Sequence, residues 1–287
     1  MPLHLNAIGV HPVKSTAIRR LEHATVTPTG LAGDRRWMVV DGDGAMLSAR
    51  EERRLFTIVA DTPDTDPTQQ DALLLRHRPA DGAAPAAEPL RIPEPEGPPV
   101  DLTLFGKPVR GVPADAAGTA WVREVLGRHD LTLVWCDDPS RRVLNPAWAR
   151  PGDHTAFADS SPLSVVSVAS VRHVADWVVE TCIDRGEEPV RITPERFRPN
   201  LVVEGAEAFA EDGWRRIRIG ECTFRLPGPI DRCVMTTIDP GTLDASHEPI
   251  RTLARHRRWD GATWVCVKAV PDSVGTVRVG DEVEVLE

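Results

Sequence analysis

The sequence of 287 residues contains no tyrosine and no apolar run that approaches the roughly 20 residues of a membrane-spanning helix. Its first residues also lack the basic segment followed by a long apolar core that marks a secretory signal. These absences predict a cytoplasmic protein with no membrane partner. The missing tyrosines exclude no class of protein.

Cysteine is scarce and is never arranged as C-x-x-C. An odd number of scattered cysteines argues against a disulfide framework and against a zinc knuckle. We therefore expect reduced thiols at all five positions, which are Cys136, Cys182, Cys222, Cys233 and Cys266.

Positive charge is outnumbered, and the formal net charge of −9 argues against a nucleic-acid partner. One local exception is the segment EPIRTLARHRR (248–258), which reads as a helix. Arg251, Arg255 and Arg258 recur there at helical spacing and share a face. That face is either solvated, which is the commoner case, or a docking patch for an acidic partner.

The remaining composition is that of a soluble globular protein with one large or two modest domains, since hydrophobic residues make up 41% and charged residues 27%. Short β-rich runs and turn signals alternate over the first 60 residues, as in a small meander or barrel piece. Residues 79–99 are too rich in proline for a long helix. The segment 117–127 predicts a short amphipathic helix at the seam between two domains.

The second half of the chain is dominated by strand signals. After the strands LTLVWC and PLSVVS, the segment VASVRHVADWVVE (168–180) carries the apolar stripe of a helix. Few helices interrupt the β-rich runs that follow, which indicates a barrel or a strongly curved sheet. These runs are NLVVEG, WRRIRIG, CTFRLP, RCVMTTI, ATWVCVKAV, GTVRVG and EVEVLE.

Several common sites are missing: the sequence has no Walker loop, no G-x-G-x-x-G after a strand, no H-E-x-x-H and no G-x-S-x-G. What remains is a set of single basic, hydroxyl and thiol residues where predicted elements end. Each has an ordinary explanation, because a cation at a strand end is usually solvated and a free cysteine is usually buried. They are Lys14, Ser15, Arg35, Arg198, Asn200, Arg232 and Cys233.

Separated runs in a fixed order resemble the MOSC family, named for the C-terminal domain of molybdenum cofactor sulfurase. The resemblance is strongest to its two-part members, related to the mitochondrial amidoxime-reducing component and its bacterial homologues. It extends over nearly the whole chain and is poor in 61–100 and 140–158. The runs are VHPVKS, GLAGDRRWMVVD, RFRPNLVVEG, AEDGWRRIRIG and RCVMTTIDPGT, with EPIRTLARHRR behind them.

The resemblance implies a mixed α/β, β-rich fold. In it an N-terminal MOSC-type α/β domain (1–118), whose first strand can join the barrel, precedes a MOSC β-barrel domain (119–287). It also implies a molybdenum cofactor (Mo-molybdopterin) whose metal is held by Cys233. A soft thiolate suits such a metal, and the neighbouring Arg232 favours the anionic sulfur.

Further site residues follow from the same resemblance. Lys14, Arg35 and Arg198 are expected to contact the cofactor phosphate, since a buried dianion requires several fixed donors. Ser15, Asn200 and Ser160 are expected beside them, and Asp159 is expected near the metal as a catalytic residue.

Two departures from the family pattern concern specificity. Asp231 precedes the Arg-Cys pair and would oppose the thiolate unless it faces away. Near GATWVC, the expected aromatic beside the cofactor is shifted, so Thr263 and Trp264 receive no role.

The resemblance implies a molybdenum-dependent oxidoreductase that reduces N-hydroxylated small molecules such as amidoximes or hydroxylamines. The plant-type ferredoxin spacing C-x4-C-x2-C is lacking, so a separate electron donor is expected: a ferredoxin, a flavodoxin or a flavin reductase. The helix around Arg251 and Arg255 is its expected landing site. Two alternatives stay open. One is a cofactor carrier or sulfur-transfer protein that uses Cys233, with a pyridoxal-free sulfur or cofactor donor as partner; the other is a structural domain with a degenerate site.

Overall fold

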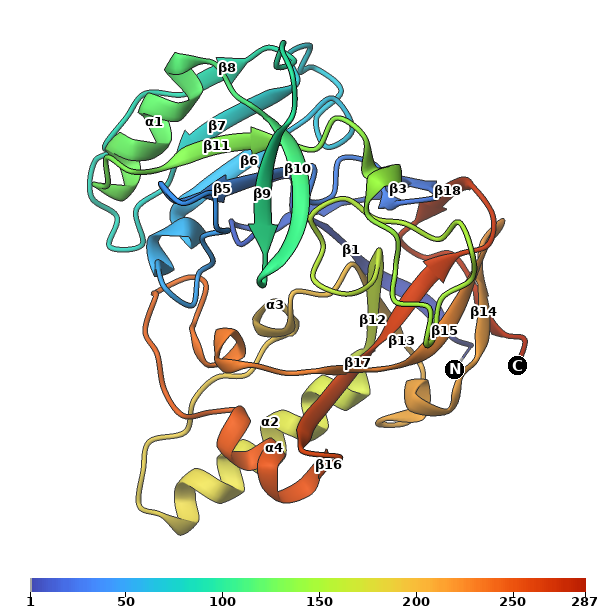
Figure 1. The fold of residues 1–287 in the computed structure, drawn as a ribbon. Helices are drawn as coiled ribbons and strands as arrows, with labels where there is room; N and C mark the ends of the chain where they lie inside the picture. Colours follow the sequence, from blue (N-terminus) through green and yellow to red (C-terminus); the bar gives the residue numbers. More distant parts are fainter. Residues whose placement is uncertain (1) are drawn as a thin grey trace. The chain divides into compact units, whose positions relative to one another are not determined.

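The computed structural model describes residues 2–287 and shows a mixed, sheet-rich fold with few helices, as expected. The chain divides into two compact units that are interleaved in sequence. Unit 1 comprises residues 2–9, 20–30 and 161–287, and unit 2 comprises residues 10–19 and 31–160 (Figure 1).

Unit 1 is organised around one large sheet. Its strands run in the order β19-β14-β15-β17-β12-β13-β1-β2, with β16 paired to β17. Their bounds are β1 His4–Val10, β2 Arg19–Leu21, β12 Leu163–Ser167, β13 Leu201–Glu204, β14 Arg216–Ile219, β15 Cys222–Asp231, β16 Arg258–Trp259, β17 Ala262–Pro271 and β19 Val283–Val285. A smaller sheet has the order β18-β3-β4, from β18 Gly275–Arg278, β3 His23–Thr27 and β4 Gly30–Leu31.

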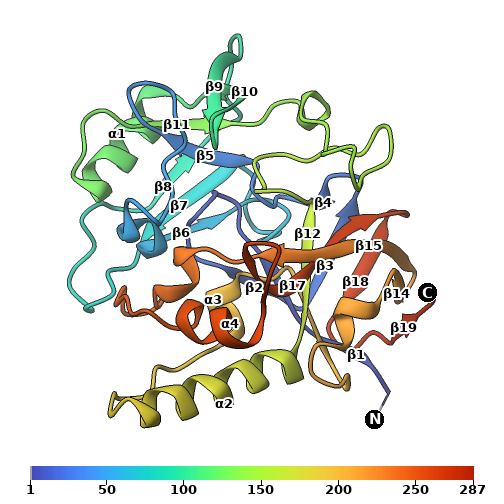
Figure 2. The same cartoon turned by 60° about the horizontal axis from the view of Figure 1, so that its bottom comes forward.

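A long helix, α2 (Val168–Asp184), follows β12 (Figure 2) and leads to β13, which pairs with β12 in parallel. It starts at Ser167, whose hydroxyl accepts a hydrogen bond from the Ser170 amide at 3.0 Å. Its apolar stripe, which the sequence predicted, packs against the sheet with Val174 and Val178 fully buried. This crossover unit places α3 (Pro194–Phe197) directly before β13.

The regular strand pairing of unit 1 leaves both ends of the path open, so it does not form the closed barrel that we expected. Contacts outside the regular ladder nevertheless join β1 to the residues before β19. An isolated bridge pairs His4 with Glu282, and the Leu5 amide donates to Asp281 O at 2.8 Å. These contacts bring β1, the strand beside the β2 end, close to the β19 end, and such curvature is typical of a strongly twisted sheet.

Two local predictions in this unit are wrong. RCVMTTI is not a strand, because β15 ends at Asp231 and the chain turns into a short 3-10 helix, η4 (Val234–Thr237). The helix expected to reach Arg258 ends earlier: α4 is Ile250–His256, and Arg258 starts the β16–β17 hairpin. The turn at Asp260 and Gly261, both with positive φ, makes that hairpin possible.

Unit 2 contains two sheets. One has the order β5-β11-β10-β9, from β5 Trp37–Val40, β11 Thr132–Trp135, β10 Lys107–Pro113 and β9 Val100–Leu104. The other has the order β6-β7-β8, from β6 Ile58–Asp61, β7 Leu73–His77 and β8 Leu90–Ile92. The predicted helix is α1 (Ala116–Leu126), capped by Asp115 and ended by the left-handed Gly127.

The proline-rich segment 79–99 contains only the short strand β8, as its composition predicts. Within residues 2–287, no helix combines the length and the apolar character needed to cross a membrane.

Candidate functional site

In unit 2, backbone hydrogen bonds hold three separated segments side by side. The Arg35 amide donates to His11 O at 2.7 Å, and the Lys14 amide donates to Trp37 O at 2.7 Å. On the other side, the Phe157 amide donates to Arg35 O at 3.0 Å. Residues 11–15, 34–37 and 157–159 therefore form one fixed platform, which carries four of the predicted site residues of this unit.

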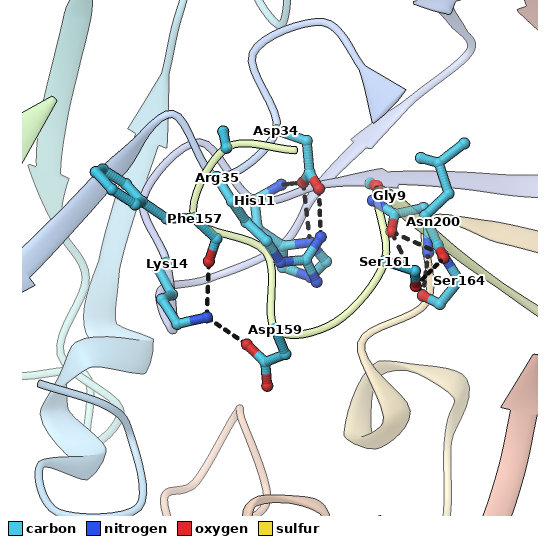
Figure 3. A network of polar contacts seen from close by, with 12 residues as sticks. Gly9, His11, Lys14, Asp34, Arg35, Phe157, Asp159, Ser161, Ser164 and Asn200 are labelled. Atoms are coloured by element: carbon cyan, nitrogen blue, oxygen red, sulfur yellow. Dashed lines mark hydrogen bonds and ion pairs between the residues drawn. The ribbon is translucent and has the colours of Figure 1, made fainter. Parts of the chain in front are cut away.

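Lys14 is the buried cation of this platform, with 3% of its side chain exposed. Its ammonium donates to Phe157 O at 2.8 Å and forms an ion pair with Asp159 (Figure 3). Burial lowers the pKa of Lys14 to about 8, and the carboxylate of Asp159 limits the reduction. The ammonium thus remains charged at neutral pH, although its pKa lies much nearer to neutral pH than that of an ordinary lysine.

Asp159 is the exposed partner, with 55% of its side chain accessible. Desolvation acts to raise the pKa of its carboxyl group, but the positive charges of Lys14, Arg35 and Arg50 outweigh that effect and hold the pKa well below its usual range. Asp159 is therefore a carboxylate at every physiological pH, and it can accept hydrogen bonds but not supply a proton.

Arg35 lies on the same platform, next to a buried carboxylate. Its guanidinium is paired with Asp34, which also accepts a hydrogen bond from the His11 amide at 2.7 Å (Figure 3). Burial acts to raise the pKa of Asp34, but Arg35 and His11 lower that pKa by more than burial raises it. The carboxyl group is therefore ionised. The arginine is thereby held in one orientation by its neighbour.

The two predicted serines of this unit differ. Ser15 is buried, whereas Ser160 is exposed. Ser15 and Arg35 have positive φ values of 67° and 50°, and Arg198 in unit 1 has 53°. Eight non-glycine residues in the described part of the chain have such values, and three of them are predicted site residues. Left-handed backbone in a residue other than glycine is strained and concentrates at functional sites.

In unit 1, Arg232 binds the backbone next to two predicted residues, Arg198 and Cys233. Its backbone amide donates to Thr263 O at 2.8 Å, and its guanidinium donates to Val265 O and, at 3.1 Å, to Phe197 O. Phe197 precedes Arg198, so Arg232 fastens the Arg198 turn beside the start of the Cys233 loop. Its Nη2 is buried and has no hydrogen-bond partner.

Cys233 follows directly and is the cap residue immediately before η4. Its side chain is half-buried, and its carbonyl accepts hydrogen bonds from both the amide and the hydroxyl of Thr236. Asp239 closes the loop: one of its oxygens accepts from the Gly241 amide at 2.8 Å and the other from Arg196 at 2.9 Å. Cys233 is the one cysteine of the described chain that is not buried, so its thiol is accessible to a ligand.

Asn200 has a different environment from the other predicted residues. Its amide nitrogen donates to Gly9 O at 3.0 Å, and its amide oxygen accepts from the Ser164 amide at 3.2 Å. The side chain is 1% exposed and joins β1 to β12 (Figure 3). These contacts give Asn200 a positioning role within the sheet.

The structure also shows where the residues of the two departures from the family pattern lie. Asp231 is exposed at the end of β15, so its charge is solvated. Thr263 donates from its hydroxyl to Arg232 O at 3.1 Å and thereby fixes the backbone before Cys233. Trp264 pairs with Asp231 and stacks on Trp259 with ring centroids 5.9 Å apart.

The sequence reasoning missed two cations around Asp159. Arg142 donates to Ala156 O at 2.7 Å and to Asp159 O at 2.9 Å, and Arg50 lies 3.8 Å from the Asp159 carboxylate. Arg142 lies in a segment where the family resemblance is poor, and Arg50 carries no sequence signal beyond its charge. Among residues 2–287, no group of three or more His, Cys, Asp and Glu side chains is arranged to hold a metal ion alone.

Comparison with known proteins gives relatives over most of the chain. Mitochondrial amidoxime-reducing component 1 of Mus musculus is 30% identical over 97% of this chain and 81% of its own length. Mitochondrial amidoxime reducing component 2 of Rattus norvegicus is 29% identical over 97% of this chain and 82% of its own. Molybdenum cofactor sulfurase of Oryza sativa subsp. japonica is 27% identical over 90% of this chain and 31% of its own.

These relatives contradict the expected cytoplasmic location, because the amidoxime-reducing components are mitochondrial by name. Short targeting segments direct proteins to compartments, and the composition of the folded domains does not encode them. Hydropathy and charge were therefore the wrong basis for that prediction.

The family models divide the chain in two. The MOSC N-terminal beta barrel domain matches residues 3–129, and the MOSC domain matches residues 152–284. Together with relatives matched over nearly the whole chain, these matches show that the protein belongs to the MOSC family.

Proposed function

We propose that this protein is a molybdenum-cofactor-dependent oxidoreductase that reduces N-hydroxylated compounds with electrons from a separate partner. One observation carries the proposal: a half-buried thiol in unit 1 and an excess of fixed cations in unit 2 occur at the positions that the family resemblance assigns to the cofactor.

The residues present fit such a group. Cys233 would hold the metal through its thiolate, and Lys14, Ser15, Arg35 and Arg198 would contact the phosphate. The buried, unpartnered Nη2 of Arg232 has a hydrogen bond to give, as the cofactor's polar edge would require. Ser160 is exposed and free to contribute its hydroxyl, and Asn200 keeps β1 and β12 in place. When bound, the cofactor supplies a metal centre that exchanges two electrons with the substrate.

The reaction consumes two electrons and two protons, breaks one N–O bond and releases water. Asp159 would accept hydrogen bonds from the N–H groups of an amidoxime, since its carboxyl group stays ionised. We propose that Asp159 orients the substrate in this way, while Lys14 stays an ammonium that contacts the phosphate.

The division into domains 1–118 and 119–287 stays a prediction. The family models leave residues 130–151 between them, and contacts within unit 2 continue to residue 160.

The electron donor is proposed to be a separate ferredoxin, flavodoxin or flavin reductase that docks on the basic segment 255–258, where α4 ends. Arg251 is held by Glu248 at 2.7 Å and by Glu187, so its charge is balanced. Arg255 and Arg258 are exposed, and they are the cations that an acidic donor could reach.

The second candidate function is cofactor carriage or sulfur transfer through Cys233, which the similarity to molybdenum cofactor sulfurase supports. Catalysis separates the two functions, because a carrier holds the cofactor without turning over an N-hydroxy compound.

The test is the molybdenum content per polypeptide after expression with an intact cofactor pathway, in the parent, in Cys233→Ala and in the control Val234→Ala, an exposed neighbour. We expect near-stoichiometric metal in the parent and the control and none in Cys233→Ala. The parent should then reduce an aryl amidoxime with chemically reduced viologen as donor. Metal without turnover favours the carrier, and absence of metal from all three refutes the proposal.

A further inference from the structure

Phe105 is an exposed aromatic residue at the tip of a strained turn in unit 2. Leu104 pairs with Lys107, so Phe105 and Gly106 form the two-residue loop between β9 and β10. Both have positive φ, 52° and 71°, which is the pattern of a type I′ turn that usually takes asparagine or aspartate followed by glycine. A phenylalanine there costs about 1 kcal/mol or more, so something other than the turn favours it.

The ring of Phe105 faces two cations of the Asp159 cluster. The Lys14 ammonium lies 5.3 Å from the ring centroid, and the Arg50 guanidinium carbon lies 4.8 Å from it. With 42% of the residue still exposed, the ring forms a cover rather than part of the core. Such a cover lowers the access of water to both cations and strengthens their attraction to an anion.

Arg50 is presented to this cluster by a fixed turn. The Glu51 carboxylate accepts hydrogen bonds from the amide and the hydroxyl of Ser48, and the Arg50 amide donates to the Ser48 hydroxyl at 3.2 Å. The Arg50 side chain is 25% exposed, yet its Nε is buried and has no hydrogen-bond partner. A buried donor without an acceptor is costly unless a ligand completes it.

The charges of the cluster do not balance. Four cations, Lys14, Arg35, Arg50 and Arg142, stand against two carboxylates, Asp34 and Asp159, which leaves two positive charges in excess. The whole chain has a net charge of −9, so this excess is a local feature. A phosphate monoester carries about −1.5 to −2 at neutral pH and would neutralise it.

We propose that Arg50 and Phe105 complete an anion site with Lys14, in which Arg50 grips a phosphate monoester and Phe105 covers it. The occupant is the phosphate of the cofactor, so the inference rests on the proposed function and adds two residues to its machinery. Arg50 contributes a fork-shaped donor where Lys14 provides a point charge.

The test uses apoprotein from a host that lacks the cofactor pathway, with inorganic phosphate as the probe and calorimetry as the readout. We expect Arg50→Gln to weaken phosphate binding about tenfold, since charge-assisted hydrogen bonds are lost. Arg53→Gln, an exposed arginine three residues on, is the matched control. Phe105→Ala should weaken binding a few-fold and raise the pKa of Lys14 measured by nitrogen NMR, whereas Val100→Ala on the same hairpin should change neither.

Equal phosphate affinity in the parent and in Arg50→Gln overturns the assignment of Arg50, and an unchanged Lys14 pKa in Phe105→Ala overturns the cover. If Arg50→Gln does not fold, the NMR resonance of the Arg50 Nε in the parent provides the test. The proposal requires that this resonance shifts when phosphate is added, and a resonance that does not shift refutes it. Holoprotein must no longer bind inorganic phosphate; if it binds as well as apoprotein, the occupant is not the cofactor. Phosphate binding through Arg50 in a protein that never holds molybdenum would refute the proposed function and the cofactor as occupant, and it would support the anion site itself.

Discussion

Replacing Lys14 by methionine should stabilise the apoprotein at neutral pH while removing a residue of the proposed site. Burial sets the pKa of Lys14 at about 8, against 10.5 for an ordinary lysine. At about 1.4 kcal/mol for each unit of pKa, the charged folded state bears a cost of about 3 kcal/mol. The lost hydrogen bond to Phe157 O offsets about 1 kcal/mol, so Lys14→Met should gain about 2 kcal/mol at pH 7.

The sign of the pH dependence follows from the direction of the shift. Below pH 8 Lys14 is protonated in the folded and the unfolded chain, and the full cost applies. Between pH 8 and 10.5 the unfolded chain binds more protons, so the stability of the parent rises with pH. The advantage of Lys14→Met over the parent should therefore narrow by about 2 kcal/mol between pH 7 and pH 10.

Urea unfolding of both apoproteins over this pH range measures the effect directly. Taking the difference between parent and variant removes the contribution of every other titrating group. Two results would show that the charge of Lys14 does not destabilise the fold. One is a difference in unfolding free energy between variant and parent that stays constant from pH 7 to pH 10; the other is a variant that is less stable than the parent at pH 7.

Three further outcomes are expected. Arg232→Gln should lower thermal stability and molybdenum content together, since it releases Phe197 O and Val265 O, whereas Arg258→Gln, an exposed arginine, should change neither. Asn200→Ala should destabilise the fold by about 2 kcal/mol, measured by urea unfolding, because two backbone groups joining β1 and β12 lose their partner. Charge reversal at Arg255 and Arg258 should reduce turnover with an acidic protein donor at low salt and leave viologen-driven turnover unchanged; equal loss with both donors contradicts the docking surface.

Elements with a strong local pattern could be predicted from the sequence. The helix at 168–180 extends to Asp184 but lies where its apolar stripe placed it, and Gly127 ends α1 in the left-handed conformation. RCVMTTI failed because its β-branched residues favour a strand, while tertiary contacts decide otherwise: Arg232 bonds Thr263 O and Asp239 closes a turn.

The candidate site was accessible to the sequence only through resemblance. No pattern around Arg50 or Arg142 distinguishes them from solvated arginines, since their role depends on where Asp159 lies after folding. The positive φ of Ser15, Arg35 and Arg198 is equally invisible in a sequence without glycine at those positions. Whether these residues bind a cofactor stays a prediction.

The interleaving of the two units has a consequence for biosynthesis. Unit 2 ends at residue 160, so a ribosome has delivered all of it before most of unit 1 has been made. Strand β1 pairs with β2, which is synthesised soon after it, but its other neighbour, β13, emerges almost 200 residues later. One edge of β1 is thus exposed during translation, and a chaperone that shields it should raise the yield of folded protein more than one that binds the finished chain.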